Sequence, residues 1–292
     1  MISALKSVAR WIVRSLVYAY LAHRHWTLPD AERWAERLKA WPAFFAQHPF
    51  SKRIRVRGGA LIEVGLIDVI ERHLLVAGRW EEHVESTLES MLQPGACFLD
   101  VGSNIGHFTL LAAKRVGASG TVIAVEPCWQ NLSKLARNLA LNQADNVYLT
   151  SIAAGALPAL GAIAFPTLNN AGAATMRAVA PEMARQCVLI GALDDSLESC
   201  GFRPSLIKID VEGFELQALR GLKRCLEQLR PAVILELTPA FLRQAGDSAT
   251  ALLQFMADLG YRCDTLVGGR RIDAQQVDIE HMGQIDVIFR PQ

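Results

Sequence analysis

The alternation of hydrophobic and polar positions predicts an α/β core that begins near residue 95. Short apolar runs typical of buried strands alternate with longer segments that have the spacing of amphipathic helices. Strands are expected at Cys97–Val101, Thr121–Val125, Val147–Ile152, Val188–Leu193, Leu206–Ile209, Ala232–Leu237, Arg262–Val267 and Ile285–Phe289. Helices are expected at Ile105–Val116, Asn131–Asn142, Glu215–Leu229, Phe241–Gln244 and Thr250–Leu259. This order favours a doubly wound, mostly parallel sheet that is covered by helices.

The segment before the core predicts a hairpin and a helix. Arg53–Arg57 and Leu61–Leu66 flank Gly58 and Gly59, which is a turn pattern of β-hairpins. Glu81–Leu92 then has helical spacing. We expect a helical appendage before the hairpin and one main domain after it. The predicted boundaries are 1–50 for the appendage, 51–292 for the main domain, 51–94 for its hairpin and helix, and 95–292 for its Rossmann-like core.

Residues 153–187 interrupt the alternation of strands and helices. Apart from a short strand at Ala162–Phe165, this stretch has no regular pattern. Because ligands of open α/β sheets bind at the carboxyl ends of the strands, we interpret the stretch as an insertion over the active face. Asn169, Asn170 and Gly172 lie within it, and their amides could contact a substrate or simply form a turn.

The N-terminal segment has an apolar run with a basic stripe. Trp11–Ala22 is largely apolar but is interrupted by Arg14, and only eight residues follow without a charge. A membrane-spanning helix needs about 20 apolar residues, so this segment is too short to span a bilayer. Lys6, Arg10 and Arg14 would lie on one face of a helix. We expect that helix to pack on the protein or on a second subunit; the alternative is peripheral contact of residues 1–25 with an anionic membrane surface.

Composition narrows the class of protein. The chain has 292 residues, of which 51% are hydrophobic and 20% charged, and this excludes a disordered chain. Thirty basic and 29 acidic residues give a net charge of +1, which disfavours nucleic acid as a partner. The six cysteines are widely separated and contain no C-x-x-C pair. This pattern favours free thiols in a reducing cytoplasm.

A glycine-containing loop follows the first core strand. Its candidate cofactor residues are Asp100, Gly102, Ser103, Asn104 and Gly106. The glycines allow a sharp turn, and the exposed N–H groups at the start of the following helix suit an anion such as the carboxylate of S-adenosylmethionine. Glu126 ends the second strand, where a carboxylate can accept both hydroxyls of a ribose. The same strand, loop and helix also occur in nicotinamide sites, but here the spacing is G-x-x-x-G.

Several stretches together resemble the FkbM family of class I methyltransferases. They are FLDVGSNIGHFTL at 98–110, VEP at 125–127, NAG at 170–172, LDDSL at 193–197, LIKIDVEGFELQALRG at 206–221 and ILEL at 234–237. The resemblance implies S-adenosylmethionine as cofactor, a seven-stranded sheet with an antiparallel last strand, and O-methylation as the usual reaction. It also implies that Glu81 folds over the cofactor. Ser103 and His107 depart from the alanine and the aromatic residue that are more common in the family.

The second charged segment, LIKIDVEGFE, supplies the candidate catalytic residues. Lys208, Asp210 and Glu212 lie at the end of an otherwise apolar strand, and alternation would place them on one side. Our hypothesis is that Asp210 or Glu212 removes the proton of an acceptor hydroxyl while Lys208 orients the base. The alternative is that this cluster only braces the cofactor loop. His107 is a less favoured base. A divalent ion held by Asp210, Glu212 and Glu236 is a disfavoured alternative, because the sequence has no dedicated metal motif, and no metal site is assigned.

These features predict an S-adenosylmethionine-dependent methyltransferase. The expected reaction is O-methylation of a hydroxyl on a small molecule, a sugar or glycan, or a natural product. The alternatives are a nicotinamide-dependent oxidoreductase and a non-catalytic, cofactor-binding or membrane-associated protein.

Overall fold

The structure is a computed structural model in which residues 15, 51–66, 68–165, 175, 184–268, 271–272 and 278–292 are described. The chain divides into two compact units, Met1–Trp80 and Glu81–Gln292, and each is treated separately below. Apart from Ser15, the predicted appendage with its basic stripe lies outside the described residues. The same holds for Asn169, Asn170 and Gly172.

The described part of the first unit contains the predicted hairpin. Strands β1 (Lys52–Arg55) and β2 (Leu61–Val64) pair antiparallel, and the turn between them uses Gly58 in a left-handed conformation (φ 75°). Helix α4 (Val69–Ala77) follows, and the carboxylate of Asp68 caps its start by accepting backbone N–H groups. Thus the hairpin prediction is confirmed, whereas α4 was not predicted.

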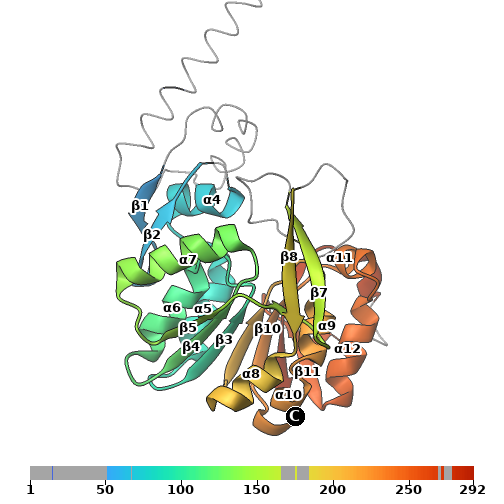
Figure 1. The fold of residues 1–292 in the computed structure, drawn as a ribbon. Helices are drawn as coiled ribbons and strands as arrows, with labels where there is room; N and C mark the ends of the chain where they lie inside the picture. The colour runs from blue at the N-terminus through green and yellow to red at the C-terminus, as the bar shows by residue number, and fades with distance from the viewer. Residues whose placement is uncertain are drawn as a thin grey trace, which may run out of the picture. The chain divides into compact units, whose positions relative to one another are not determined.

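The second unit is built around an eight-stranded sheet with the order β12-β11-β13-β10-β9-β3-β4-β5 (Figure 1). The strands are β3 (Cys97–Val101), β4 (Thr121–Val125), β5 (Val147–Thr150), β9 (Leu206–Ile209), β10 (Ala232–Leu237), β11 (Tyr261–Thr265), β12 (Arg271–Ile272) and β13 (Ile285–Pro291). The five strands from β10 to β5 are parallel, and β13 is antiparallel to both of its neighbours. This confirms the mostly parallel sheet with an antiparallel last strand, to which the two-residue β12 is an addition.

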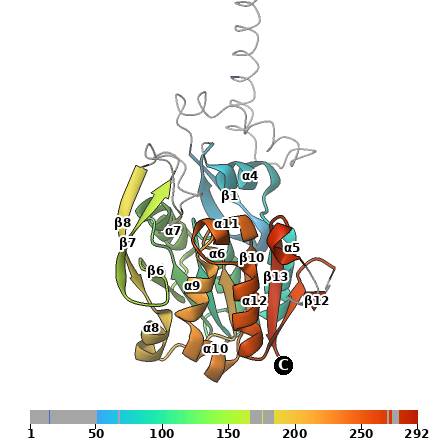
Figure 2. The same ribbon diagram turned by 90° about the vertical axis from the view of Figure 1, so that its right-hand side faces the viewer.

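Helices cover both faces of this sheet (Figures 1 and 2). They are α5 (Glu82–Met91), α6 (His107–Val116), α7 (Trp129–Asn142), α8 (Leu193–Cys200), α9 (Glu215–Arg220), α10 (Lys223–Leu229), α11 (Pro239–Gln244) and α12 (Ala249–Asp258). Buried side chains of α8 to α12 form one large core with alternate residues of the central strands. Helix α6 packs on β3 and β4 and is in contact with α5. None of the described helices has the length and apolar character needed to cross a bilayer.

The prediction of one helix over Glu215–Leu229 is wrong, because the chain turns between α9 and α10. A Cβ atom on Gly221 would lie 2.1 Å from the carbonyl oxygen of Gly155, so the backbone approaches another segment closely at this point. The carboxylate of Asp194 on α8 then accepts the N–H groups of Arg224 and Cys225 in the first turn of α10. Helix α8 was itself not predicted, and the expected strand Val188–Leu193 ends before it.

The insertion is more regular than predicted. Strands β6 (Ala153–Ala154), β7 (Ala159–Phe165) and β8 (Ala184–Gly191) form a separate sheet in the order β6-β8-β7. The side chain of Gln186 on β8 accepts the N–H of Trp129 at 3.0 Å and donates to the carbonyl of Pro127 at 2.8 Å. Part of the insertion therefore lies beside the segment that follows β4. Alanine and glycine in β7 have low strand propensity, which explains why the full strand was missed.

All six cysteines are free thiols, as predicted. Cys128, Cys225 and Cys263 are buried, whereas Cys187 and Cys200 are exposed.

Candidate active site

Strand alternation gathers charged side chains on one face of the sheet. In β3, β9 and β10 one set of alternate residues lies in the core beneath α8 to α12. The other set includes Asp100, Lys208 and Glu236, which therefore lie on the opposite face. Asp100 is directly opposite Lys208 in the register of β3 and β9. Two buried ionisable side chains thus lie on neighbouring strands, near the carboxyl ends of β3 and β9.

The segment Asp100–Gly106, here called the glycine loop, is held by main-chain hydrogen bonds to the end of β4. The N–H groups of Gly102 and Ser103 donate to the carbonyl of Val125 at 2.9 and 3.1 Å. The N–H of Asn104, which has a positive φ of 50°, donates to Glu126 Oε2 at 2.8 Å. The loop conformation is therefore established by the protein itself.

The two glycines of the loop are required by contacts within the protein. Both have positive φ angles, 84° for Gly102 and 92° for Gly106. A Cβ atom on Gly102 would lie 1.9 Å from the carbonyl oxygen of Asp210, and one on Gly106 would lie 2.4 Å from Leu135 Cδ1. The glycine loop consequently packs directly against Asp210, the residue that follows β9.

Asp100 is buried beneath the glycine loop. Its Oδ2 accepts the hydroxyl of Thr109 at 2.6 Å. Burial raises the pKa of Asp100, although the positive charge of Lys208 acts in the opposite direction. Asp100 Oδ1 and Ser103 Oγ are buried without a hydrogen-bond partner among the described residues. Helix α6 begins at Gly106 without a side-chain cap, so its first N–H groups are suited to an anionic ligand.

Glu126 is buried at the end of β4. Its Oε1 accepts the N–H of Cys128 and its Oε2 that of Asn104, both at 2.8 Å. Burial raises the pKa of Glu126 to about 7, even though both N–H groups favour the ionised form. A carboxylate oxygen can accept two hydrogen bonds. The Glu126 carboxylate therefore keeps the capacity to accept hydroxyl groups of a ligand.

Lys208 and Asp210 form a close ion pair, as the sequence led us to expect. Lys208 Nζ lies 2.9 Å from Asp210 Oδ2 and 4.7 Å from the centre of the Phe108 ring. Burial alone would lower the pKa of Lys208, but Asp210 and Glu81 outweigh this effect and raise it above its usual value. The lysine therefore remains charged next to Asp210.

Three carboxylates, Glu81, Asp210 and Glu236, form what is here called the acidic cluster. One oxygen from each lies within 4.8 Å of the other two. Burial raises the pKa of Glu236 to about 9, and the charges of Asp210 and Glu81 add to this effect. At neutral pH the cluster therefore holds a proton on Glu236. Oxygen atoms at this spacing can also bind a divalent cation.

Glu212 and Glu215 follow β9 and occupy different environments. The strand ends at Ile209 and Glu212 has a positive φ of 54°, so strand alternation does not extend to it. Glu212 nevertheless lies close enough to Glu236 to contribute to its raised pKa. The Glu215 carboxylate accepts the N–H of Gly213 at 2.9 Å, and burial raises its pKa to about 7. Glu215 thus supports the turn, whereas Glu212 belongs to the surroundings of the acidic cluster.

Comparison with known proteins identifies the family. A family model described as the methyltransferase FkbM domain matches residues 100–263, which is more than half of the chain. The chain belongs to the FkbM methyltransferase family. The match includes the glycine loop, Glu126 and the Lys208–Asp210 pair.

Individual relatives and solved structures match this FkbM methyltransferase only over a short stretch or at low sequence identity. An arsenite methyltransferase of Halobacterium salinarum is 40% identical over 67 residues, which cover 23% of this chain and only 17% of that protein. A precorrin-6y C5,15-methyltransferase from Geobacter metallireducens has a TM-score of 0.44 and 18% identity, covering 73% of this chain and 91% of that one. A methyltransferase FkbM from Methylobacillus flagellatus has a TM-score of 0.43 and 17% identity, covering 87% of this chain and 59% of that one.

Two histidine–carboxylate contacts on α5 of this methyltransferase were not predicted. His107 Nε2 lies 2.6 Å from Glu85 Oε1, and His83 Nε2 lies 2.5 Å from Asp286 Oδ2. In the sequence His107 was the less favoured base, and the structure pairs it with Glu85 instead. In the sequence, Glu85 stands next to the apolar residue Val84 in a segment with helical spacing. This position does not indicate which residue Glu85 contacts.

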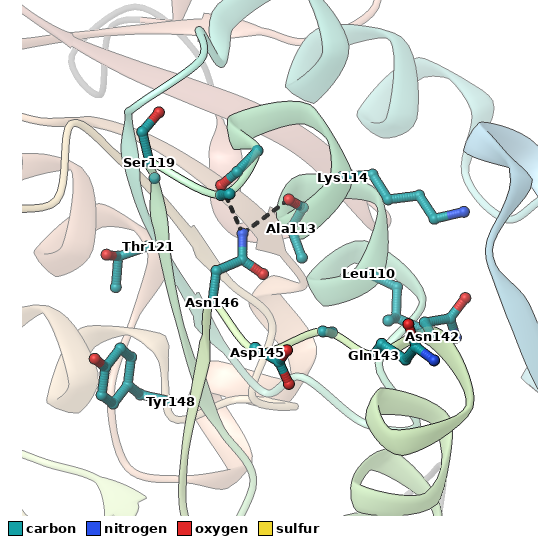
Figure 3. A pocket seen from close by; sticks show the side chains of 14 residues that line it. Leu110, Ala113, Lys114, Ser119, Thr121, Asn142, Gln143, Asp145, Asn146 and Tyr148 are labelled. Carbon is teal, nitrogen blue, oxygen red and sulfur yellow. Dashed lines mark hydrogen bonds between the residues drawn. The ribbon is translucent and has the colours of Figure 1, made fainter.

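A cavity of about 490 Å³ lies at the opposite end of the sheet from the candidate site. Residues at the starts of β4 and β5 line it, including Thr121 and Tyr148 (Figure 3). The side-chain amide of Asn146 donates to the carbonyls of Ala113 and Gly117 and so satisfies the end of α6 (Figure 3). None of the candidate catalytic or cofactor residues lines this cavity.

Proposed function

We propose that this methyltransferase uses S-adenosylmethionine to methylate a hydroxyl group on a small molecule, a sugar or glycan, or a natural product. The observation that supports this most directly is the contact between Gly102 and the backbone of Asp210. It brings the candidate cofactor loop and the candidate proton acceptor together at the carboxyl ends of β3 and β9. Methyl transfer requires such proximity of donor and acceptor.

The residues around the glycine loop fit this cofactor chemically. The uncapped start of α6 suits a carboxylate. Asp100 Oδ1 and Ser103 Oγ, which lack hydrogen-bond partners among the described residues, are polar atoms available to an ammonium group or to bridging water. Glu126 would accept a ribose hydroxyl, since the hydrogen bonds from Asn104, Cys128 and the Asn131 side chain do not use all of the lone pairs of its two oxygens. When bound, S-adenosylmethionine would supply a methyl group activated by its sulfonium charge.

On the acceptor side, Asp210 is the proposed general base. Lys208 Nζ lies 2.9 Å from Asp210 Oδ2 and so holds this carboxylate in place. Asp210 would accept the hydroxyl proton, while Lys208 keeps it oriented and Phe108 excludes water from the lysine. Glu236, which carries a proton at neutral pH, limits the negative charge beside the base. A positioned base of this kind contributes about 10²–10⁴-fold to a rate.

The proposed acceptor is small because the net charge of +1 offers little attraction for a phosphate backbone. Cytoplasmic location, peripheral membrane contact through residues 1–25 and homo-oligomerisation remain predictions from the sequence.

Calorimetry and a methyl-transfer screen test the proposed function. We expect S-adenosylhomocysteine to bind the full chain and NAD not to bind. We also expect radiolabelled S-adenosylmethionine to label one class among sugars, lipid alcohols and polyketide-like alcohols, with EDTA present to exclude a metal requirement. Binding of NAD alone would overturn the assignment. Labelling of an amine or a carbon atom, with no hydroxyl acceptor, would reject O-methylation but retain the cofactor.

A further inference from the structure

Helix α5 carries two acidic residues one turn apart, and both face functional parts of the second unit. Glu81 is the N-cap residue and belongs to the acidic cluster. Glu85 is buried on the next turn, and its N–H donates to the Glu81 carbonyl at 3.1 Å. This hydrogen bond couples the positions of the two residues. Whatever holds Glu85 therefore also influences where the Glu81 carboxylate lies.

A buried contact joins Glu85 to α6. His107 Nε2 and Glu85 Oε1 are 2.6 Å apart, and the side chains are only 4% and 0% exposed. His107 directly follows the glycine loop and begins α6. In the same helical turn, Phe108 lies against Lys208 and Thr109 donates to Asp100. One turn of α6 thus contacts α5, the lysine of the ion pair and the buried aspartate.

We propose that His107 and Glu85 are positioning residues whose contact holds Glu81 in the acidic cluster. This inference rests on the proposed function, because it gives Glu81 a place on the acceptor side of the reaction. Through α5, the residue that begins α6 at the end of the glycine loop determines the arrangement of carboxylates around Asp210.

The backbone conformation of Glu81 indicates that contacts such as the one between His107 and Glu85 are needed to maintain it. Glu81 has a left-handed conformation, with φ 48° and ψ 65°, which is uncommon for residues other than glycine, asparagine and aspartate. A backbone of this kind persists only where the surrounding contacts maintain it. A second contact also holds α5. It joins His83 Nε2 to Asp286 Oδ2 at 2.5 Å and does not involve His107. The helix should therefore remain in place when the His107 contact is removed, while its first turn loosens.

Variants of His107 test the proposal by kinetics. His107→Phe keeps an aromatic ring but has no group to pair with Glu85, whereas His107→Gln can still donate a hydrogen bond. We expect His107→Phe and Glu81→Gln each to lower kcat by about 10-fold, within the range for a misplaced catalytic group. The double variant should lose no more than either single variant, because residues acting through one another are not additive. His107→Gln should restore most of kcat, and Kd for S-adenosylhomocysteine should stay within about 3-fold.

Hydrogen–deuterium exchange of the cofactor-free protein is a second test of the proposal, and it does not depend on catalysis. In His107→Phe, amides in the first turn of α5 should exchange about 10-fold faster than in the original chain, and in His107→Gln they should not. Ser90→Ala, at an exposed position near the other end of the same helix, is the control and should leave both exchange and kcat unchanged. Additive losses in the double variant, or unchanged exchange in His107→Phe, would overturn the proposal. If no acceptor is methylated, the proposed function fails, and the exchange experiment still decides whether His107 holds α5.

Discussion

In the glycine loop main-chain hydrogen bonds determine the geometry, whereas in the acidic cluster side-chain charges do. The N–H groups of Gly102 and Ser103 bind the end of β4, and that of Asn104 binds Glu126. The acidic cluster instead brings three carboxylates within 4.8 Å of one another beside Lys208. The loop is held by hydrogen bonds within the protein, whereas the negative charge of the cluster is offset by Lys208 and by a proton on Glu236.

This difference separates the two sides of the proposed reaction. A loop held by main-chain hydrogen bonds should be disrupted mainly by changes of shape, because an added Cβ atom on either of its glycines would overlap a neighbouring segment. A cluster of charges tolerates changes of shape better, but its properties should depend on protonation and on each carboxylate. Substitutions that preserve volume and remove charge should therefore affect the acceptor side most strongly. Substitutions that add volume should affect the donor side.

The largest effect is expected for Asp210→Asn. This change preserves volume and removes the proposed base, so kcat should fall by about 10²–10⁴-fold, while Kd for S-adenosylhomocysteine changes little. Single-turnover methyl transfer and calorimetry measure the two quantities. Glu212→Gln is the matched control and should lower kcat much less, because Glu212 lies in the turn after β9 and is not part of the Lys208–Asp210 ion pair. If Asp210→Asn loses cofactor affinity instead, the cluster braces the glycine loop and the proposed catalytic role is wrong.

Gly102→Ala should have the next largest effect and act on the donor side. Its Cβ would lie 1.9 Å from the Asp210 carbonyl, and its φ of 84° is unfavourable for alanine. We expect a loss of about 2–4 kcal/mol in the free energy of unfolding together with loss of S-adenosylhomocysteine binding. Gly201→Ala is a matched control, because Gly201 also has a positive φ of 68° but no atom within 4 Å of the added Cβ. It should lose only about 1–2 kcal/mol. Urea unfolding measures the free energy of unfolding of both variants. If the two variants lose the same amount, the close approach of Gly102 to Asp210 does not contribute to stability.

The strands that carry the site were predictable from the sequence because they are continuous apolar runs with polar ends. The bounds of β3, β4, β9 and β10 agree with the prediction at every residue. Two features of the structure were not predicted, and both depend on contacts with segments that are distant in the sequence. The break at Gly221 depends on the backbone of Gly155, and the close approach of Gly102 depends on Asp210.

The site residues were predictable as candidates, but their pairing was only partly so. The Lys208–Asp210 pair follows from alternation along one strand, and the structure confirms it at 2.9 Å. Proximity of Glu81 to this pair could not be derived, because it depends on how α5 packs. The contact between His107 and Glu85 was also missed, since 22 positions separate the two residues and neither belongs to a recognisable pattern.

A smaller effect is expected for the pH dependence of cofactor binding through Glu126. Its pKa of about 7 lies above the usual value, so the carboxylate becomes protonated as pH falls below 7. The protonated group is a poorer acceptor for a ribose hydroxyl, and affinity for S-adenosylhomocysteine at pH 6 should be about 10-fold lower than at pH 8. Glu126→Gln should bind weakly at both pH values. Calorimetry across this range measures the dependence, and an affinity that is flat between pH 6 and 8 in the original chain would show that Glu126 does not bind the ribose in its ionised form.

The smallest effect is expected for Glu236→Gln and concerns stability. The folded-state pKa of Glu236, about 9, lies above the usual value of 4.5. The folded protein therefore binds more protons than the unfolded chain between these values, and its stability falls as pH rises through this window. Because the glutamine side chain does not titrate, the variant should match the original chain at pH 5 and be more stable at pH 8. The expected gain is about 1–2 kcal/mol, or roughly 2–6 °C in Tm.

Thermal unfolding at the two pH values measures this gain. Glu227→Gln serves as the control, because Glu227 forms an exposed ion pair with Lys223 and should contribute less than about 1 kcal/mol at either pH. A gain for Glu236→Gln that is the same at pH 5 and pH 8 would mean that packing, and not charge, limits the acidic cluster. In that case the contrast between a charge-determined cluster and a backbone-determined glycine loop would not hold.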